Sequence, residues 1–150
     1  MFEFLAYTVA DVMTPRPTTI RPDTTIEEVD RVLADQDFNG LPVVDADGTL
    51  VGMVTKLDLL KAFAFTPEHV VPPYDEIVAR PAATVLTADP VTVTPDLPLT
   101  RVLQRMLETR HRSFPVVDGR RLVGMIARED LMRALRMAVA GEHPTHPSGH

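Results

Sequence analysis

The chain carries one sequence pattern twice, and this repeat constrains the fold more than any other feature. The stretch LPVVDADGTLVGMV at 41–54 returns as FPVVDGRRLVGMI at 114–126. Pro42 and Pro115 are 73 residues apart, and the same spacing aligns TTIRPD at 18–23 with VTVTPD at 91–96. A match that spans most of the 150 residues predicts two similar folding units.

Each copy presents its predicted elements in the same order. Short strands at 18–20 and 91–94 are bounded by prolines and are each followed by an amphipathic helix. We expect Thr24 and Glu27 to form a capping box at the start of the first of these helices. Two strands joined by a tight Asp-Gly turn follow, and then a second helix. The predicted strand pairs are 41–45 with 50–55 and 114–118 with 122–127, and the closing helices are 57–63 and 129–138. The order β-α-β-β-α, written twice, predicts an α+β fold.

The chain divides into two motifs and three connecting segments. The stretch FTPEHVVPPYD at 65–75 has three prolines and no hydrophobic period, which is typical of a linker. The last ten residues are polar and interrupted by proline, so we expect a disordered tail. Its three histidines lack any element to fix a coordination geometry, and no metal site is predicted. The predicted boundaries are a helical lead-in at 1–8, motif 1 at 9–64, a linker at 65–81, motif 2 at 82–140 and the tail at 141–150.

Composition narrows the classes of function. The chain has no cysteine, which excludes disulfides and thiolate chemistry and suits a reducing cytoplasm. No apolar run approaches the roughly 18 residues of a membrane span. The formal net charge of −6 disfavours a nucleic acid partner. The second half, with 10 Lys and Arg against 8 Asp and Glu, could still bind a small anion.

A strand-to-helix corner occurs in both copies with one notable change. Residues 52–60 read GMVTKLDLL and residues 124–132 read GMIAREDLM. Asp58 lies three residues after Thr55, so both side chains emerge on one face of the first helical turn. A carboxylate there can accept both hydroxyls of a ribose. The same Thr-x-x-Asp spacing also predicts a capping box, so ligand binding and helix capping both remain open.

The combined motifs resemble the CBS domain. The resemblance rests on a repeat that opens with VMTP, continues through LPVVDADGTLVG and closes with GMVTKLD, in two copies over nearly the whole chain. Paired CBS motifs are known as Bateman modules. The resemblance implies two β-α-β-β-α motifs packed about a pseudo-twofold axis, with clefts between them and frequent pairing of modules. Many members of the family bind adenosyl compounds in these clefts, including AMP, ADP, ATP and S-adenosylmethionine.

The resemblance also suggests which residues contact such a ligand. Asp58 and Asp130 correspond to the ribose contacts, with Thr55 beside the first of them. The first strands would present Ile20 and Val93 to the adenine, although both could equally be core residues. The positions for phosphate are held by Asn39, Lys56, Arg112 and Arg128. The copies are unequal, because Ala127 replaces the threonine while the arginines lie in the second copy. This predicts one ligand, or two that bind with different affinities.

We therefore expect a regulatory module that senses an adenosyl ligand and signals to a separate effector protein. A homodimer is expected, and no membrane association is. The alternative is a ligand-free dimerisation or assembly module. An enzyme is disfavoured, because His111 has no partner nucleophile or second carboxylate near it in sequence.

Overall fold

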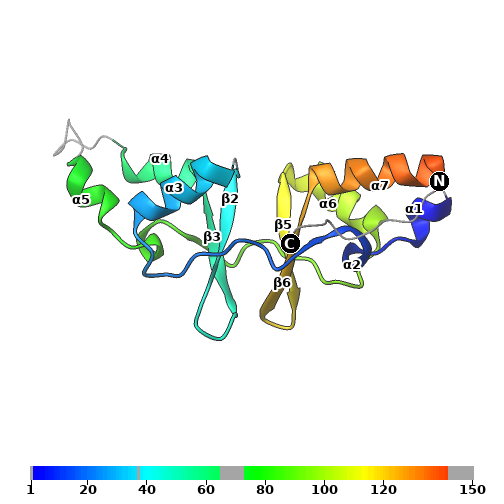
Figure 1. Ribbon diagram of the computed structural model, residues 1–150, viewed down its shortest axis with the longest axis horizontal. Coiled ribbons are helices and arrows are strands. Elements are labelled where there is room, and N and C mark those ends of the chain that lie inside the picture. The colour runs from blue at the N-terminus through cyan, green and yellow to red at the C-terminus, as the bar shows by residue number, and fades with distance from the viewer. Residues whose placement is uncertain (1, 37, 65–72, 142–150) are drawn as a thin grey trace. The chain divides into compact units, whose positions relative to one another are not determined.

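The computed structural model describes residues 2–36, 38–64 and 73–141. The chain forms two compact units (Figure 1). One consists of Thr18–Pro90 and is called here the first-repeat unit. The other joins Met1–Pro17 to Val91–His150 and is called the second-repeat unit. Within the described ranges, no helix is both long enough and apolar enough for a membrane span.

The first-repeat unit is built on a three-stranded antiparallel sheet of order β2-β3-β4. Its strands are β2 (Gly40–Val44), β3 (Leu50–Thr55) and β4 (Thr87–Ala88). Ile20 forms a parallel bridge with Val43, which places the predicted first strand beside β2. The helices α3 (Ile26–Gln36) and α4 (Lys56–Ala62) precede and follow the hairpin, as the repeat predicted.

The second-repeat unit repeats this arrangement. Its sheet has the order β1-β6-β5, from β1 (Thr14–Pro15), β6 (Arg121–Ala127) and β5 (Ser113–Asp118). Val93 bridges Val116 in parallel, as Ile20 bridges Val43. The helices are α6 (Leu99–Thr109) and α7 (Arg128–Ala140). The α+β prediction is confirmed, with hairpin strands and helices displaced by at most two residues from their predicted ends.

Each repeat is completed by the segment that precedes the other repeat. Helices α1 (Phe2–Ala6) and α2 (Val9–Val12) join the second-repeat unit, where the Leu99 N–H donates to the Tyr7 carbonyl. In the first-repeat unit, α5 (Tyr74–Val78) and the 3₁₀ turn η1 (Ala82–Thr84) take the matching places, and the Ile26 N–H donates to the Arg80 carbonyl. The 73-residue spacing relates both pairs, so the repeat extends into residues 2–17 and 74–90, which are called here the two lead-ins.

Two local expectations differ from the structure. The predicted linker at 65–81 contains α5, a helix too short to show a hydrophobic period; residues 65–72 lie outside the described residues. The predicted capping box of Thr24 and Glu27 is wrong, because Thr25 and not Thr24 caps the helix. The Thr25 hydroxyl accepts from the Glu28 N–H at the start of α3, whereas the Thr24 hydroxyl accepts from the Arg21 N–H in the preceding turn. Thr24 and Thr25 each have a glutamate three residues later, so the sequence pattern alone could not distinguish which threonine caps the helix.

Glycines in the central strands permit close approach of the short strands. A Cβ on Gly52 would lie 2.5 Å from the carbonyl oxygen of Thr87 in β4. A Cβ on Gly124 would lie 2.9 Å from that of Thr14 in β1. Both distances are shorter than real side chains tolerate, so each repeat uses glycine to seat its third strand.

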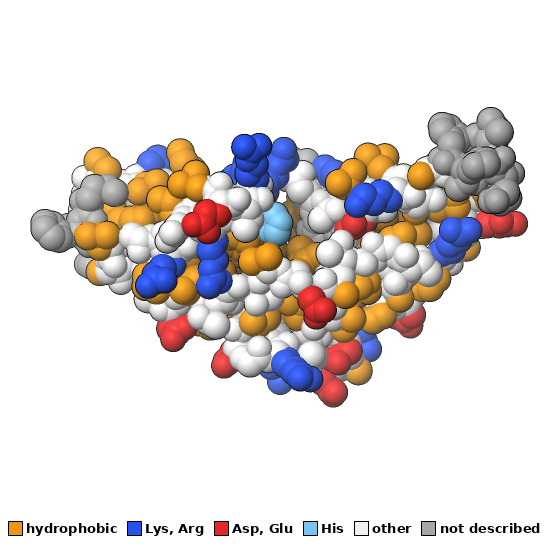
Figure 2. Space-filling view, turned by 180° about the vertical axis from the view of Figure 1, so that it is seen from behind, with side chains coloured by type: hydrophobic (Ala, Val, Ile, Leu, Met, Phe, Trp, Pro, Cys, Tyr) orange, Lys and Arg blue, Asp and Glu red, His pale blue; other side chains and the backbone are white. Residues whose placement is uncertain are grey.

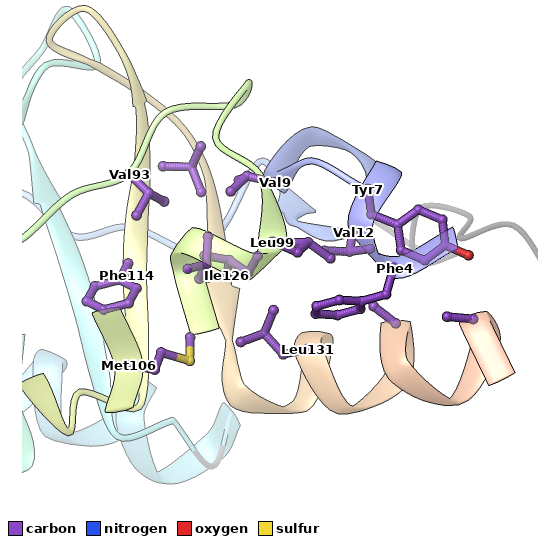
Figure 3. Close-up of a cluster of buried hydrophobic side chains, with 14 residues drawn as sticks. Phe4, Tyr7, Val9, Val12, Val93, Leu99, Met106, Phe114, Ile126 and Leu131 are labelled. Carbon is purple, nitrogen blue, oxygen red and sulfur yellow. The ribbon is translucent and has the colours of Figure 1, made fainter. Parts of the chain in front are cut away.

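Each unit has its own hydrophobic core. In the second-repeat unit, Phe4 and Val12 from the lead-in lie in one cluster with Phe114 and Ile126 from the hairpin and Leu131 from α7 (Figure 3). The first-repeat core gathers the same elements around another set of side chains, which includes Ile20, Val29, Leu33, Leu41, Val54 and Ile77. The lead-ins therefore contribute buried apolar surface and stabilise the repeat against which they pack.

Candidate functional site

The corner between β3 and α4 contains the predicted capping box with both of its hydrogen bonds. Thr55 is the residue before the helix, and its hydroxyl accepts from the Asp58 N–H at 3.2 Å. In return, Asp58 Oδ2 accepts from the Thr55 N–H at 2.8 Å and from the Thr55 hydroxyl at 3.0 Å. The capping interpretation of Thr-x-x-Asp is thus confirmed, and it leaves the ligand interpretation open.

Asp58 is nearly inaccessible and has a further partner that the sequence did not suggest. Only 7% of the residue is exposed. The Thr87 hydroxyl in β4, 29 residues along the chain, lies 3.2 Å from Asp58 Oδ1. A buried carboxylate needs hydrogen-bond donors for both of its oxygens. Thr55 supplies the donors to Oδ2, and Thr87 supplies the donor to Oδ1. The repeat aligns Thr87 with Thr14, but among the described residues Thr14 makes no matching hydrogen bond to Asp130, so the repeat alone does not predict this partner.

The corner between β6 and α7 holds the matching carboxylate in a different way. Asp130 is 6% exposed, and its Oδ2 accepts from the Ala127 N–H at 2.8 Å. Ala127 has no hydroxyl that could accept a hydrogen bond from the Asp130 N–H, so only one of the two hydrogen bonds of a capping box is present. Arg133 Nη2 instead lies 3.2 Å from Asp130 Oδ1 and donates to the Val12 carbonyl at 3.0 Å. The Arg133 guanidinium therefore contacts Asp130, whereas in the first repeat threonine hydroxyls donate to Asp58.

Burial dominates the electrostatics of Asp130. Loss of solvent raises the pKa of its carboxyl above the ordinary value, and the nearby Glu129 charge acts in the same direction. The hydrogen bond from Ala127 and the charge of Arg133 act in the opposite direction and offset only part of the rise in pKa. Burial therefore disfavours the charged form of Asp130. A shifted pKa of this kind is common in binding sites and also in structural ion pairs.

The residues predicted to contact phosphate are brought together in pairs. In the first-repeat unit, the Lys56 N–H donates to the Asn39 carbonyl at 2.9 Å. In the second-repeat unit, the Arg128 N–H donates to the Arg112 carbonyl at 3.0 Å. All four residues are exposed, and each pair flanks the helix start that carries the aspartate. The structure therefore places Asn39, Lys56, Thr55 and Asp58 at one corner, and Arg112, Arg128 and Asp130 at the other.

The basic groups of the second corner are not equally free. The Arg128 guanidinium donates to the carbonyls of Arg110 and His111 at 2.8 and 3.4 Å, where α6 ends. Arg110 itself has a positive φ of 61°, so Arg128 also stabilises an unusual turn. The Arg112 side chain has no hydrogen bond or ion pair among the described residues. His111 lies at the surface.

Ile20 and Val93, the residues predicted to contact adenine, occupy equivalent places in the two cores. They are 5% and 1% exposed. Their main chains are also engaged, because Ile20 binds the strand around Pro42 and Val44, and Val93 binds the strand around Pro115 and Val117. Both side chains are thus core residues of their units.

Metal binding has no support in the part of the chain that the structure describes. No group of three or more His, Asp or Glu side chains there could hold an ion. The histidines of the predicted tail lie outside the described residues, which end at Gly141.

Comparison with known proteins identifies the repeat. The family model of the CBS domain matches residues 9–65 and again 82–137. The chain belongs to the CBS domain family. The CBS domain-containing protein CBSX2 of Arabidopsis chloroplasts is 29% identical over 85% of this chain and 63% of its own length. A homoserine O-acetyltransferase of Methanococcoides burtonii is 35% identical over 88% of this chain. The chain spans only 25% of the length of that relative.

Solved structures of CBS pairs resemble the chain along most of its length. The crystal structure of CBSX2 in complex with AMP has a TM-score of 0.77 and 30% sequence identity, over 89% of this chain and 99% of that one. The CBS domain pair of protein MJ0100, in complex with 5′-methylthioadenosine and S-adenosyl-L-methionine, has a TM-score of 0.70 and 28% identity. It covers 88% of this chain and 98% of that one. CBS pairs related to this chain therefore bind adenosyl compounds.

Proposed function

We propose that the chain is a regulatory module that binds an adenosyl compound, such as AMP, ADP, ATP or S-adenosylmethionine, and signals to a separate partner protein. The observation that carries the proposal is the repeated corner, where each CBS motif holds one nearly buried aspartate at the start of a helix. Adenosyl ligands in CBSX2 and MJ0100, at about 30% identity, support it. The absence of cysteine suits a cytoplasmic location, which is part of the proposal.

The proposed contacts follow the geometry of the corners. Asp58 and Asp130 would accept the ribose hydroxyls, and Thr55 would donate beside the first of them. The exposed side chains of Asn39, Lys56, Arg112 and Arg128 would meet phosphate groups, and the main chains near Ile20 and Val93 would meet the adenine. Arg112 is the strongest candidate for phosphate, because its guanidinium is exposed and a guanidinium can bind phosphate through two parallel hydrogen bonds.

The proposal is tested by binding to the full chain. Calorimetry and thermal shift should be run with AMP, ADP, ATP, S-adenosylmethionine and NADH on the wild type and on Asp58→Asn and Asp130→Asn. Asparagine keeps an acceptor for the helix cap and removes the charge. We expect one or more of these ligands to bind, and the variant at an occupied corner to weaken binding about tenfold or more. Asp35→Asn, at an exposed position of α3, is the matched control.

Two outcomes would count against this function. If no adenosyl compound raises the melting temperature at saturating concentration, the sensing proposal is wrong. If binding persists unchanged in the double variant Asp58→Asn/Asp130→Asn, the ligand binds elsewhere. Arg112→Gln separates the phosphate contact, because it should weaken ATP more than adenosine.

The alternative of an assembly module is favoured by one specific observation. Large apolar side chains are exposed on α4 and α7, including Leu60 at 68% and Val139 at 78%, and Figure 2 shows hydrophobic side chains at the surface of both units. Such side chains suit a second copy of the chain. Sedimentation analysis of Leu60→Glu and Val139→Glu should show a dimer dissociating, while Arg120→Glu, in an exposed hairpin turn, should leave it intact. A dimer without any adenosyl binding would favour the assembly function alone.

A further inference from the structure

A pocket of about 400 Å³ lies within the first-repeat unit, and the candidate ribose contact Asp58 is one of its lining residues. Helix α4 contributes Asp58, Lys61 and Ala62 to its lining, and the segment around η1 contributes Arg80, Thr84 and Val85. This volume lies within the range of about 300–1,000 Å³ that is common for small-molecule sites. None of the residues predicted from the sequence for adenine or phosphate lines it, so the pocket is distinct from those contacts.

The second-repeat unit uses the corresponding side chains internally. The repeat aligns Arg133 with Lys61 and Tyr7 with Arg80. Arg133 is occupied by Asp130 and by the Val12 carbonyl, at 3.2 and 3.0 Å. Tyr7 is buried in the core that α1 completes. In that unit the two positions therefore contribute to folding.

In the first-repeat unit, the two cations that line the pocket, Lys61 and Arg80, are not used in this way. The Thr87 hydroxyl lies 3.2 Å from Asp58 Oδ1, and among the described residues Lys61 does not form with Asp58 the ion pair that Arg133 forms with Asp130. Lys61 and Arg80 are exposed, and within the described residues neither makes a side-chain hydrogen bond or an ion pair. Two cations against the one buried carboxylate leave the lining with a net positive charge, which attracts an anion.

We propose that this pocket binds a small molecule that carries a carboxylate or phosphate group. The Lys61 ammonium and the Arg80 guanidinium hold the anionic group, and a neutral body packs against Ala62 and Val85. Asp58, whose oxygens accept hydrogen bonds from Thr55 and Thr87, closes the floor and excludes a second anionic group nearby. The proposal does not depend on adenosyl binding, although Asp58 would belong to both sites.

The test uses inorganic phosphate and malonate as separate probes on the full chain at constant ionic strength, followed by amide chemical shifts in NMR. We expect saturable shifts at Lys61, Ala62, Arg80 and Val85. Lys61→Gln and Arg80→Gln should each weaken binding about tenfold, the loss expected for one charge-assisted hydrogen bond. Arg120→Gln, in an exposed hairpin turn, should bind as the wild type does.

The two probes identify the anionic group. A response to phosphate alone assigns a phosphate-bearing ligand, and a response to malonate alone assigns a carboxylate. The proposal is overturned if neither probe gives localised, saturable shifts, or if the double variant Lys61→Gln/Arg80→Gln binds with wild-type affinity. Adenosyl binding by Arg80→Gln should be unchanged, so failure of this site is separable from failure of the adenosyl site.

Discussion

The two strand-to-helix corners present the same buried carboxylate with different partners. Asp58 is surrounded by hydroxyls, from Thr55 in its own turn and from Thr87 in β4. Asp130 has one main-chain N–H and the guanidinium of Arg133. The two repeats therefore share the buried aspartate and differ in the groups that donate hydrogen bonds to it.

The comparison changes the meaning of the exchange of Thr55 for Ala127. From the sequence, it was a single lost hydroxyl. In the structure it accompanies a second exchange, because Arg133 replaces the hydroxyl of Thr87 as the donor from outside the turn. One corner therefore has neutral donors and the other an ionic donor. The two corners should therefore differ in their response to mutation and to pH.

The largest effect of a mutation on stability should come from the two cores, which have equivalent positions in the repeat. Leu41 and Phe114 hold the same place in β2 and β5 and are 1% and 0% exposed. Phe114→Ala should lower the free energy of unfolding by about 3–5 kcal/mol and Leu41→Ala by about 2–5 kcal/mol, through lost burial and the cavity left behind. Urea denaturation measures both. Leu107→Ala, at an exposed position, should stay within about 0.5 kcal/mol, and an equally small loss at Phe114 would contradict the assigned core.

A smaller effect should distinguish the cations of the two closing helices. Arg133→Met leaves the buried Asp130 with one donor fewer and should cost about 1–3 kcal/mol, since Arg133 is only 30% exposed. Lys61→Met should change stability by less than about 0.5 kcal/mol, because Lys61 makes no ion pair in the described part of its unit. Thermal and urea unfolding of both variants give the comparison. Equal losses would mean that the two corners are electrostatically alike.

Much of this arrangement could be predicted from the repeat. The 73-residue spacing located both hairpins and all four principal helices, and Thr55-x-x-Asp58 correctly predicted a reciprocal cap. These features depend on neighbours in sequence, where periodicity and turn chemistry are informative. The same spacing would have paired α1 with α5, but short helices carry too little pattern to be recognised.

The remaining features depend on contacts between distant segments. Arg133 reaches the carbonyl of Val12, 121 residues away, and Thr87 reaches Asp58 across 29 residues. Nothing in the local sequence specifies such partners. Similarly, the residues before the first repeat join the second-repeat unit, because each sheet takes its third strand from the opposite lead-in. The roles proposed for the ligand contacts stay predictions, since they concern a molecule and not the fold.

The capping hydroxyl should have a modest effect on the free energy of unfolding. Removing it at the first corner should destabilise the protein, and adding it at the second should stabilise it. Thr55→Ala should lower the free energy of unfolding by about 1 kcal/mol, because the Asp58 N–H loses its acceptor. Ala127→Thr should raise it by about 0.5–1 kcal/mol, because it supplies the missing half of the second capping box. Hydrogen exchange of the Asp58 and Asp130 amides reports each cap directly. A destabilised Ala127→Thr protein would show that the second corner has no room for the hydroxyl.

The smallest effect is a pH dependence confined to the ionic corner. Burial raises the pKa of Asp130, so the native state keeps its proton to a higher pH than the unfolded chain, whose value is about 3.9. Between these two values the native state binds more protons, and its stability must fall as pH rises. Asp130→Asn should abolish this component, whereas Arg133→Met should extend it to higher pH, because the charge that lowers the pKa is lost. NMR titration of the Asp130 carboxyl carbon checks the direction, and an inflection at or below the ordinary value would show that Arg133 and the Ala127 amide outweigh burial.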